Sequence, residues 1–354
     1  MSDKAYLILE NNTVFEGRFF GGRGDVTGEI VFTTGMTGYL ETLTDPSYHG
    51  QIVLQTFPLI GNYGVIPEDF ESAFVGAKAY IVKHPCREPS NFRSEGNLDA
   101  FLKERGIVGI CETDTRALTR IIREHGVMNG KITERPPAED DRAEAENYSI
   151  KNPVAAVSSR GVHKIGEGSR RVALMDYGAK RGIAEALAAR DCEVWIFPHD
   201  APVGEIMKIE PKGIMLSNGP GDPADPENAP IIETLRALSK ERVPIFGICL
   251  GHQLLALANG YKTQKLKFGH RGANQPVKDL STGRVYITSQ NHGYAVIADD
   301  ASFINVNDNT CEGMDYGISF SVQFHPEARS GPRDTNFLFE RFIERIDERA
   351  ARTP

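Results

Sequence analysis

The segment around Cys249 constrains the fold of this chain more than any other. An apolar run, residues 243–248, passes directly into a helix-like run, residues 250–259, and Cys249 stands at the junction. Gly247 lies two positions before the cysteine and Gly251 two positions after it. This pattern predicts a sharp strand-to-helix turn that the flanking glycines permit and that presents the cysteine side chain as a nucleophile.

Strand-like and helix-like runs alternate from residue 171 onward. Such a rhythm predicts an α/β fold in which a mostly parallel, flavodoxin-like sheet is covered by helices on both faces. After residue 260 we expect only shorter strands before a terminal helix. The expected strands are residues 172–175, 194–197, 213–216, 244–248, 284–288 and 318–324, and the expected helices are 181–190, 204–208, 231–240, 250–259 and 336–348.

The first 130 residues follow a different pattern, rich in strands and turns. Alternating or β-branched runs at residues 5–9, 29–33 and 51–55 are separated by glycine-rich turns. One helix is expected at residues 115–125, where apolar residues recur at helical spacing. We therefore predict a strand-rich N-terminal domain.

The periodic pattern decays between residues 133 and 168. Residues 134–141 are charged, contain proline and are poor in apolar side chains, so we place the connection between domains in or just after them. The predicted organisation is an N-terminal, partner-facing domain over residues 1–150, a linker over 151–170 and an α/β domain over 171–354.

The composition is typical of a globular protein that acts without nucleic acid or membrane. Of the residues, 40% are hydrophobic and 25% are charged, and the formal net charge of -8 argues against a nucleic-acid-binding surface. No stretch approaches the roughly 18 apolar residues of a membrane helix. The five cysteines are odd in number and contain no C-x-x-C pair, so we expect no disulfide framework, no metal site and a cytoplasmic location.

His325 and Glu327 supply the groups that a cysteine nucleophile needs. The histidine ring would take the thiol proton, and the carboxylate would orient the ring. His325 follows the run 318–324, and the loop 217–223 follows another expected strand. In parallel α/β sheets ligands bind beyond the carboxyl ends of the strands, so these segments and Cys249 are predicted to converge on one rim.

Together these segments resemble the class I glutamine amidotransferase family, whose cysteine releases ammonia from the side chain of glutamine. The resemblance implies that Cys249 attacks the amide carbon, that His325 acts as base and then as acid, and that Glu327 orients it. The tetrahedral oxyanion would be held by the N–H of Leu250 at the start of the helix and, by resemblance, by the N–H of Gly219.

The rest of the chain resembles the small-subunit family of carbamoyl phosphate synthetase. The resemblance implies a glutaminase that passes ammonia to a separate large subunit, in a heterodimer that makes carbamoyl phosphate for arginine and pyrimidine biosynthesis. The matching segments are residues 28–39, 43–48, 58–64, 114–120, 267–277 and 289–296.

The family's glutamine contacts carry over to the matching positions of this chain. Gln253 would help to fix the substrate, and Ser47 would reach it from the first domain. Tyr294 departs from the phenylalanine common in the family, a change that matters little if the contact is made through the backbone. The full set of implied contacts is Ser47, Gly219, Gly221, Leu250, Gln253, Asn291, Gly293 and Tyr294.

No nucleotide-binding motif accompanies these residues. Residues 219–221 lack the spacing of a phosphate loop, and residues 22–28 miss the dinucleotide fingerprint. We therefore expect no cofactor in this chain. ATP, magnesium and bicarbonate would be used by the partner subunit, and this chain would bind L-glutamine.

Three other functions stay open. The glutaminase of another synthetase, such as that for GMP or anthranilate, would leave residues 1–130 unexplained. A stand-alone hydrolase of γ-glutamyl or peptide bonds would be highly active without a partner. A regulatory scaffold that has lost its chemistry would lack Cys249 or His325, and both are present.

Overall fold

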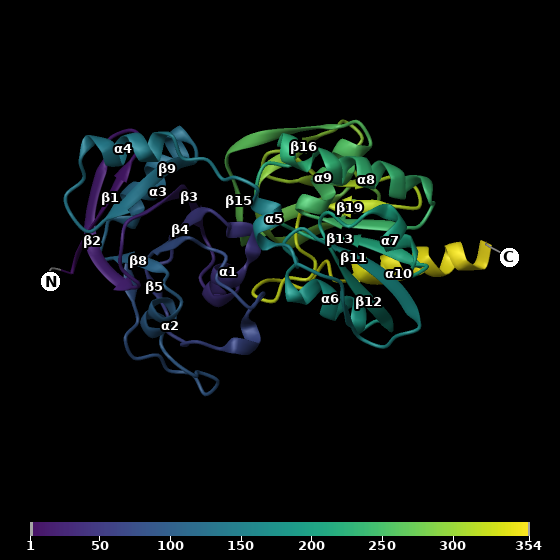
Figure 1. Cartoon of the computed structure of the whole chain (residues 1–354), viewed down its shortest axis with the longest axis horizontal. Helices are drawn as coiled ribbons and strands as arrows, with labels where there is room; N and C mark the ends of the chain where they lie inside the picture. The colour runs from purple at the N-terminus through teal and green to yellow at the C-terminus, as the bar shows by residue number, and fades with distance from the viewer. Residues whose placement is uncertain (1–2, 353–354) are drawn as a thin grey trace. The chain divides into compact units, whose positions relative to one another are not determined.

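The computed structural model describes residues 3–352, which form two compact units (Figure 1). The first unit ends at Lys151 and the second begins at Asn152. A strand-rich barrel precedes an α/β unit, and the predicted fold class is confirmed.

The first unit is a closed barrel with short helices packed on its outer face. Its strands follow the order β1-β2-β8-β6-β4-β3-β9, so the barrel has no unpaired edge. Helix α3 has the bounds that the sequence predicts. The elements are β1 (Lys4–Leu9), β2 (Val14–Gly21), β3 (Val26–Thr33), α1 (Tyr39–Thr44), η1 (Pro46–Tyr48), β4 (Gln51–Gln55), β5 (Leu59–Ile60), η2 (Pro67–Asp69), β6 (Ala79–Ile81), β7 (His84–Pro85), α2 (Leu98–Glu104), β8 (Val108–Cys111), α3 (Thr115–His125), β9 (Met128–Thr133) and α4 (Glu139–Glu146).

Alternate side chains of the barrel strands face two apolar regions. Ile30 and Ile52 are fully buried. Their neighbours Val31 and Val53 join a cluster that also contains Leu40 of α1 and side chains of α2. This two-residue period explains why the β-branched runs of the sequence locate these strands correctly.

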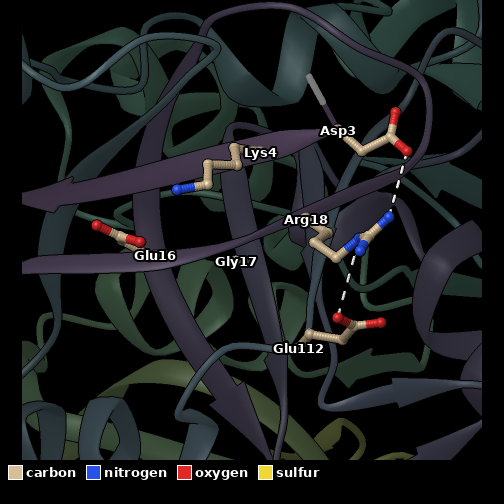
Figure 2. A pocket seen from close by; sticks show the side chains of 6 residues that line it. All are labelled: Asp3, Lys4, Glu16, Gly17, Arg18 and Glu112. Carbon is tan, nitrogen blue, oxygen red and sulfur yellow. Dashed lines mark hydrogen bonds and ion pairs between the residues drawn. The ribbon is translucent and has the colours of Figure 1, made fainter. Parts of the chain in front are cut away.

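A shallow surface hollow of about 360 Å³ lies beside β1 and β2 (Figure 2). Arg18 reaches Asp3 at 3.3 Å and Glu112 at 3.9 Å across it. These side chains are about half exposed, and ion pairs in contact with water add little stability. The hollow contains none of the predicted site residues.

Helix α4 begins inside the charged stretch 134–141, where the sequence shows no helical periodicity. The carboxylate of Asp141 is buried and accepts a hydrogen bond from the N–H of Ala138 at 2.8 Å. It also pairs with Lys131 of β9 at 3.0 Å and with Arg135 at 2.7 Å. Charged contacts thus hold the helix where hydrophobic periodicity gives no signal.

The second unit is an α/β fold built on one sheet. Residues 151–170, predicted as a linker, include α5 and β10, and β10 pairs with β12. The division of the chain into domains and linker stays a prediction. The elements are α5 (Pro153–Val157), β10 (His163–Ile165), β11 (Arg170–Asp176), α6 (Arg181–Ala188), β12 (Cys192–Pro198), α7 (Val203–Met207), β13 (Gly213–Leu216), η3 (Pro226–Asn228), α8 (Ala229–Lys240), β14 (Ile245–Ile248), α9 (Leu250–Ala258), β15 (Lys262–Asp279), β16 (Val285–Ile297), β17 (Phe303–Asn305), β18 (Cys311–Asp315), β19 (Phe320–Val322) and α10 (Phe337–Arg352).

The centre of this sheet is parallel, in the order β12-β11-β13-β14-β19. Numbered along the chain, that is the 2-1-3-4-5 order of flavodoxin-like folds. Val172 and Leu174 face a core shared with α6 and α10. Ala173 and Met175 face a core shared with α7, α8 and α9. Helices therefore cover both faces of the sheet (Figure 1), as predicted.

Strands β15 and β16 correct the expectation of shorter strands after residue 260. They contain 18 and 13 residues and pair with each other in antiparallel fashion. The register shifts between Lys265 and His270 and again between Gly272 and Gln275. These irregularities break the strict alternation of side chains, which is why the sequence pattern shows only fragments of the two strands.

Aromatic packing fixes the two strands that lead to Cys249 and His325. Phe246 of β14 stacks on Phe320 of β19 with ring centroids 4.3 Å apart. The ring centroids of Phe339 and Phe342 in α10 lie 5.7 and 5.8 Å from that of Phe246. Burying each such ring contributes about 1.5–3 kcal/mol, so the terminal helix holds these strands in place. Among residues 3–352, no helix has the length and apolar character needed to cross a membrane.

Replacing Asp141 with Asn is expected to lower the free energy of unfolding by about 3 kcal/mol, because two cations lose a buried partner. Burial raises the pKa of Asp141, but the Ala138 N–H, Arg135 and Lys131 outweigh it and lower the pKa to about 2. The contribution should therefore be complete above about pH 4, the pKa in the unfolded chain, and be lost as the pH falls toward 2. Urea unfolding at several pH values measures it.

The control is Asp140→Asn, which changes an exposed carboxylate of the same helix. It should shift the unfolding free energy by no more than about 0.5 kcal/mol. Equal stability of the two variants at neutral pH would show that the buried contacts do not hold α4.

Candidate active site

Three segments of the second unit meet at the carboxyl ends of adjacent parallel strands. Cys249 follows β14, His325 closely follows β19, and the loop 217–221 follows β13. Strand β14 pairs with β13 on one side and with β19 on the other. The structure thus brings together the three segments that the sequence predicts to converge.

Cys249 adopts an unusual backbone conformation, with φ 54° and ψ −104°, at the start of α9. Its N–H donates to the carbonyl of Val322 at 2.9 Å, which ties the turn to β19. A non-glycine residue held at such a φ costs on the order of 1–3 kcal/mol. The strain of the turn is therefore carried by the cysteine itself.

The flanking glycines serve close packing. A Cβ on Gly247 would come within 2.8 Å of the Gly251 carbonyl, and a Cβ on Gly251 within 2.5 Å of the Leu216 carbonyl oxygen. Neither glycine has a positive φ. The glycines are needed because α9 lies directly on β13 and β14, which corrects the expectation that they supply the turn's conformational freedom.

His325 and Glu327 form a buried pair. The ring Nδ1 lies 2.6 Å from the Glu327 carboxylate, so it carries a proton and donates it. The ring Nε2 is buried and makes no other hydrogen bond among residues 3–352, and the ring interacts with the Cys249 side chain. It is the nitrogen available to exchange a proton with a thiol.

The charges around His325 favour its protonated form. Burial and the Lys180 ammonium lower the pKa of His325, but Glu327 and Cys249 outweigh them and raise it. Burial raises the pKa of Glu327, yet His325 and Lys180 bring it below its usual value. An imidazolium beside a carboxylate is the state that stabilises a cysteine thiolate.

Lys180 is a site residue that the sequence analysis missed. It follows β11, and its Nζ lies 3.6 Å from Glu327, with both side chains buried. Its backbone N–H donates to the Asn218 side chain at 3.0 Å, in the loop after β13. The rule that sites lie at the carboxyl ends of parallel strands, applied to β11, would have indicated this residue.

His252 lies one turn along α9 from Cys249 but is not a candidate base. Its Nδ1 is 2.8 Å from the Ser321 hydroxyl, and burial lowers its pKa to about 3. The ring is therefore neutral at physiological pH and already bonded to β19.

The loop after β13 is packed against the cysteine turn. The N–H of Gly251 donates to the Ser217 carbonyl at 3.0 Å. A Cβ on Gly219 would overlap the Tyr177 carbonyl and come within 2.8 Å of the Leu250 side chain. The two predicted oxyanion donors, Gly219 and Leu250, thus belong to segments in direct contact.

Strand β16 supplies the other side of the site. The Cys249 thiol lies 3.6 Å from the carbonyl of Asn291. Gln253 donates its side-chain amide to the carbonyl of Tyr294 at 2.8 Å and to Gln323 at 2.9 Å. Gly293 lies between Asn291 and Tyr294 in the same strand. These residues are gathered around the cysteine, and their contact with glutamine stays a prediction.

The remaining predicted glutamine contacts are Gly221 and Ser47. Gly221 has φ 96° and leaves no room for a side chain beside Pro153. Ser47 belongs to the first unit, in η1, where its N–H donates to the Asp45 carboxylate at 2.9 Å. The role of both in binding glutamine stays a prediction.

One group of His and Glu side chains among the described residues has the spacing of metal ligands: His270, His292 and Glu312, whose candidate atoms lie within 4.8 Å of one another. Both rings and the carboxylate already make polar contacts, with Asp308, Gln290, Asn305 and Tyr294. We therefore assign no metal to them.

Replacing Lys180 with Met should reduce kcat/KM for glutamine roughly tenfold or more, since a charged contact contributes about 1.5–3 kcal/mol. Without this cation the pKa of His325 rises further, so the alkaline limb of the pH profile, on which the imidazolium loses its proton, should move to higher pH. Steady-state kinetics across pH measures both effects. Lys208→Met, at an exposed ion pair, is the control, and an unmoved alkaline limb in Lys180→Met would contradict the assignment.

Comparison with known proteins agrees with this geometry. Residues 7–132 match the carbamoyl-phosphate synthase small chain, CPSase domain, and residues 173–345 match the class-I glutamine amidotransferase domain. The chain is 48% identical over 353 residues to the carbamoyl phosphate synthase small chain of Fusobacterium nucleatum subsp. nucleatum, with 96% of this chain and 98% of that protein covered. It is 47% identical over 348 residues to that of Clostridium perfringens, with 96% and 99% covered. The chain therefore belongs to the family of carbamoyl phosphate synthase small chains, the glutamine amidotransferase subunits of that enzyme.

Proposed function

We propose that Cys249, His325 and Glu327 hydrolyse L-glutamine to glutamate and ammonia through a thioester. The observation that carries the proposal is the buried His325 ring, whose Nδ1 is bound to Glu327 and whose other side interacts with the Cys249 side chain. A ring held in this way can take the Cys249 proton and later return it.

The reaction begins when the Cys249 proton moves to His325 Nε2 and the thiolate attacks the side-chain amide carbon of glutamine. A tetrahedral intermediate forms, and its C–N bond breaks as His325 protonates the leaving nitrogen. Ammonia departs and a thioester is left. Water, deprotonated by His325, then attacks the thioester carbon and releases glutamate and the thiol.

The negative oxygen of both tetrahedral intermediates needs donors fixed in advance. We assign this role to the backbone N–H groups of Gly219 and Leu250. The contact between their segments, and the absence of space for a side chain at Gly219, support the assignment. Gln253, Asn291, Gly293 and Tyr294 would hold the amino-acid end of the substrate, with Ser47 and Gly221 as further contacts.

A large synthetase subunit is the proposed partner, in a cytoplasmic heterodimer. The relatives are named small chains, which implies a larger companion. The partner would use ATP, magnesium and bicarbonate to convert the ammonia to carbamoyl phosphate for arginine and pyrimidine biosynthesis. This chain itself would need no cofactor. Ammonia would have to pass directly to the partner, because in water at neutral pH it would be protonated and lose its nucleophilicity.

Cys249→Ser tests the proposal. Glutamate release should fall at least about a thousandfold, because the hydroxyl cannot replace the thiolate as nucleophile. In the complex with the large subunit, glutamine-dependent synthesis should be lost while ammonia-dependent synthesis continues. Loss of both would mean that Cys249 is structural. Fast hydrolysis by the wild-type chain, indifferent to the large subunit, would favour a stand-alone hydrolase.

A further inference from the structure

A buried polar cluster joins strands β15, β16 and β18. Its central members are His270 of β15, Gln290 and His292 of β16 and Glu312 of β18. The mechanism proposed above uses none of these side chains. Buried polar groups are costly unless their partners are arranged around them, so the cluster calls for an explanation.

Glu312 is the centre of the cluster and is fully buried. Its carboxylate accepts hydrogen bonds from the side-chain amides of Gln290 at 2.9 Å and Asn305 at 3.2 Å. The His270 Nδ1 lies 3.5 Å from the same carboxylate. The other nitrogen of His270 lies 2.8 Å from Asp308. With a proton on each ring nitrogen, His270 is a cation that opposes the effect of burial, which raises the pKa of Glu312.

The cluster continues to the glutamine site through His292. Its Nε2 lies 3.0 Å from the Gln290 side-chain oxygen, and its Nδ1 lies 2.8 Å from the Tyr294 carbonyl. That carbonyl also accepts the Gln253 amide. Gln290 and His292 flank Asn291, whose carbonyl faces the Cys249 thiol.

Glu312 fixes the orientation of Gln290. An ionised carboxylate accepts only, so it turns the Gln290 NH₂ toward itself, and the Thr288 hydroxyl accepts from the same NH₂ at 3.2 Å. His292 is neutral because burial lowers its pKa, and its one proton is on Nδ1, which donates to the Tyr294 carbonyl. The Gln290 side chain, next to Asn291, is thereby fixed by Glu312.

We propose that Glu312 and His270 form a charged pair that positions residues 290–294 of β16 for glutamine binding. The two residues are positioning residues, because they act through Gln290 and are not among the predicted substrate contacts. The inference rests on the proposed function of Cys249 and names what holds one wall of that site.

The pair also gives glutamine binding a pH dependence. His270 is faced by Glu312 of β18, by Asp308 before it and by His292 of β16. Burial lowers the pKa of His270, but Glu312 and Asp308 outweigh it and raise the pKa. The charged pair is complete below this pKa and is lost as the pH rises through it, so KM should increase on the alkaline side.

Glu312→Gln is the principal test, because it removes the charge and keeps the shape. We expect KM for glutamine to rise about tenfold, since a charge-assisted contact contributes about 1.5–3 kcal/mol. The kcat for glutamine should change less than about twofold, and ammonia-dependent synthesis by the complex should not change. The alkaline rise of KM should begin at lower pH than in the wild type, because His270 loses its carboxylate.

Asp315→Asn is the matched control. Asp315 is a carboxylate of the same strand that pairs with Arg341 and Arg345, away from the cluster. It should leave KM and its pH profile unchanged. If Glu312→Gln does not fold, His270→Gln tests the same pair, with the same expected rise in KM.

Three results would overturn the proposal. A KM within about twofold of the wild type from about pH 6 to 9 would show that the pair does not position the strand. A parallel loss of glutamine- and ammonia-dependent synthesis at unchanged KM would indicate a purely structural role. One divalent metal ion per chain in the purified protein, lost in Glu312→Gln, would make the cluster a metal site. If instead the wild type releases no glutamate, the proposed function fails before this inference is reached.

Discussion

The close backbone packing of α9 on β13 and β14 is the constraint on which the catalytic geometry depends. Gly247 and Gly251 leave no space for a Cβ, so the helix axis is pressed against the sheet directly after Cys249. The chain can turn so sharply only if Cys249 takes a strained φ. That strain needs support from elsewhere, and the packing of Phe339 of α10 on Phe246, which itself stacks on Phe320, supplies it. The lack of room for side chains at Gly247 and Gly251 thus fixes the position of the Cys249 sulfur atom.

Buried carboxylates recur in both units, and each is held by cations or hydrogen-bond donors. Asp141 has Lys131 and Arg135, Glu327 has His325 and Lys180, and Glu312 has His270 with two side-chain amides. A buried ion pair adds little net stability, but losing one partner is costly. Such pairs therefore fix geometry more than they stabilise the fold. That property suits helix α4, which has no apolar face, and the site around His325, where the positions of protons decide the chemistry.

The sequence predicts most of the α/β unit because its strands and helices are apolar and periodic, and it predicts the triad because Cys249 and His325 end such strands. It fails where polar contacts take the place of apolar ones. Helix α4 is held by Asp141, and the register shifts of β15 conceal a long strand. Lys180 and Glu312 were missed because a single charged residue in a sequence gives no sign of being buried. The partners of Lys180 and Glu312 come from distant segments of the chain and are known only from the folded structure.

Strand β16 connects the chemistry of the site to the interior of the unit. Its Asn291 carbonyl faces the nucleophile, and its Tyr294 carbonyl binds the Gln253 amide. A strand that is held only by backbone pairing can shift its register or bend, and β15 and β16 are irregular along this very stretch. Side-chain hydrogen bonds from Gln290 and His292 fix the position of β16 where the irregular backbone pairing does not. A polar cluster is suited to this task because hydrogen bonds are directional, whereas apolar packing would tolerate a displaced strand.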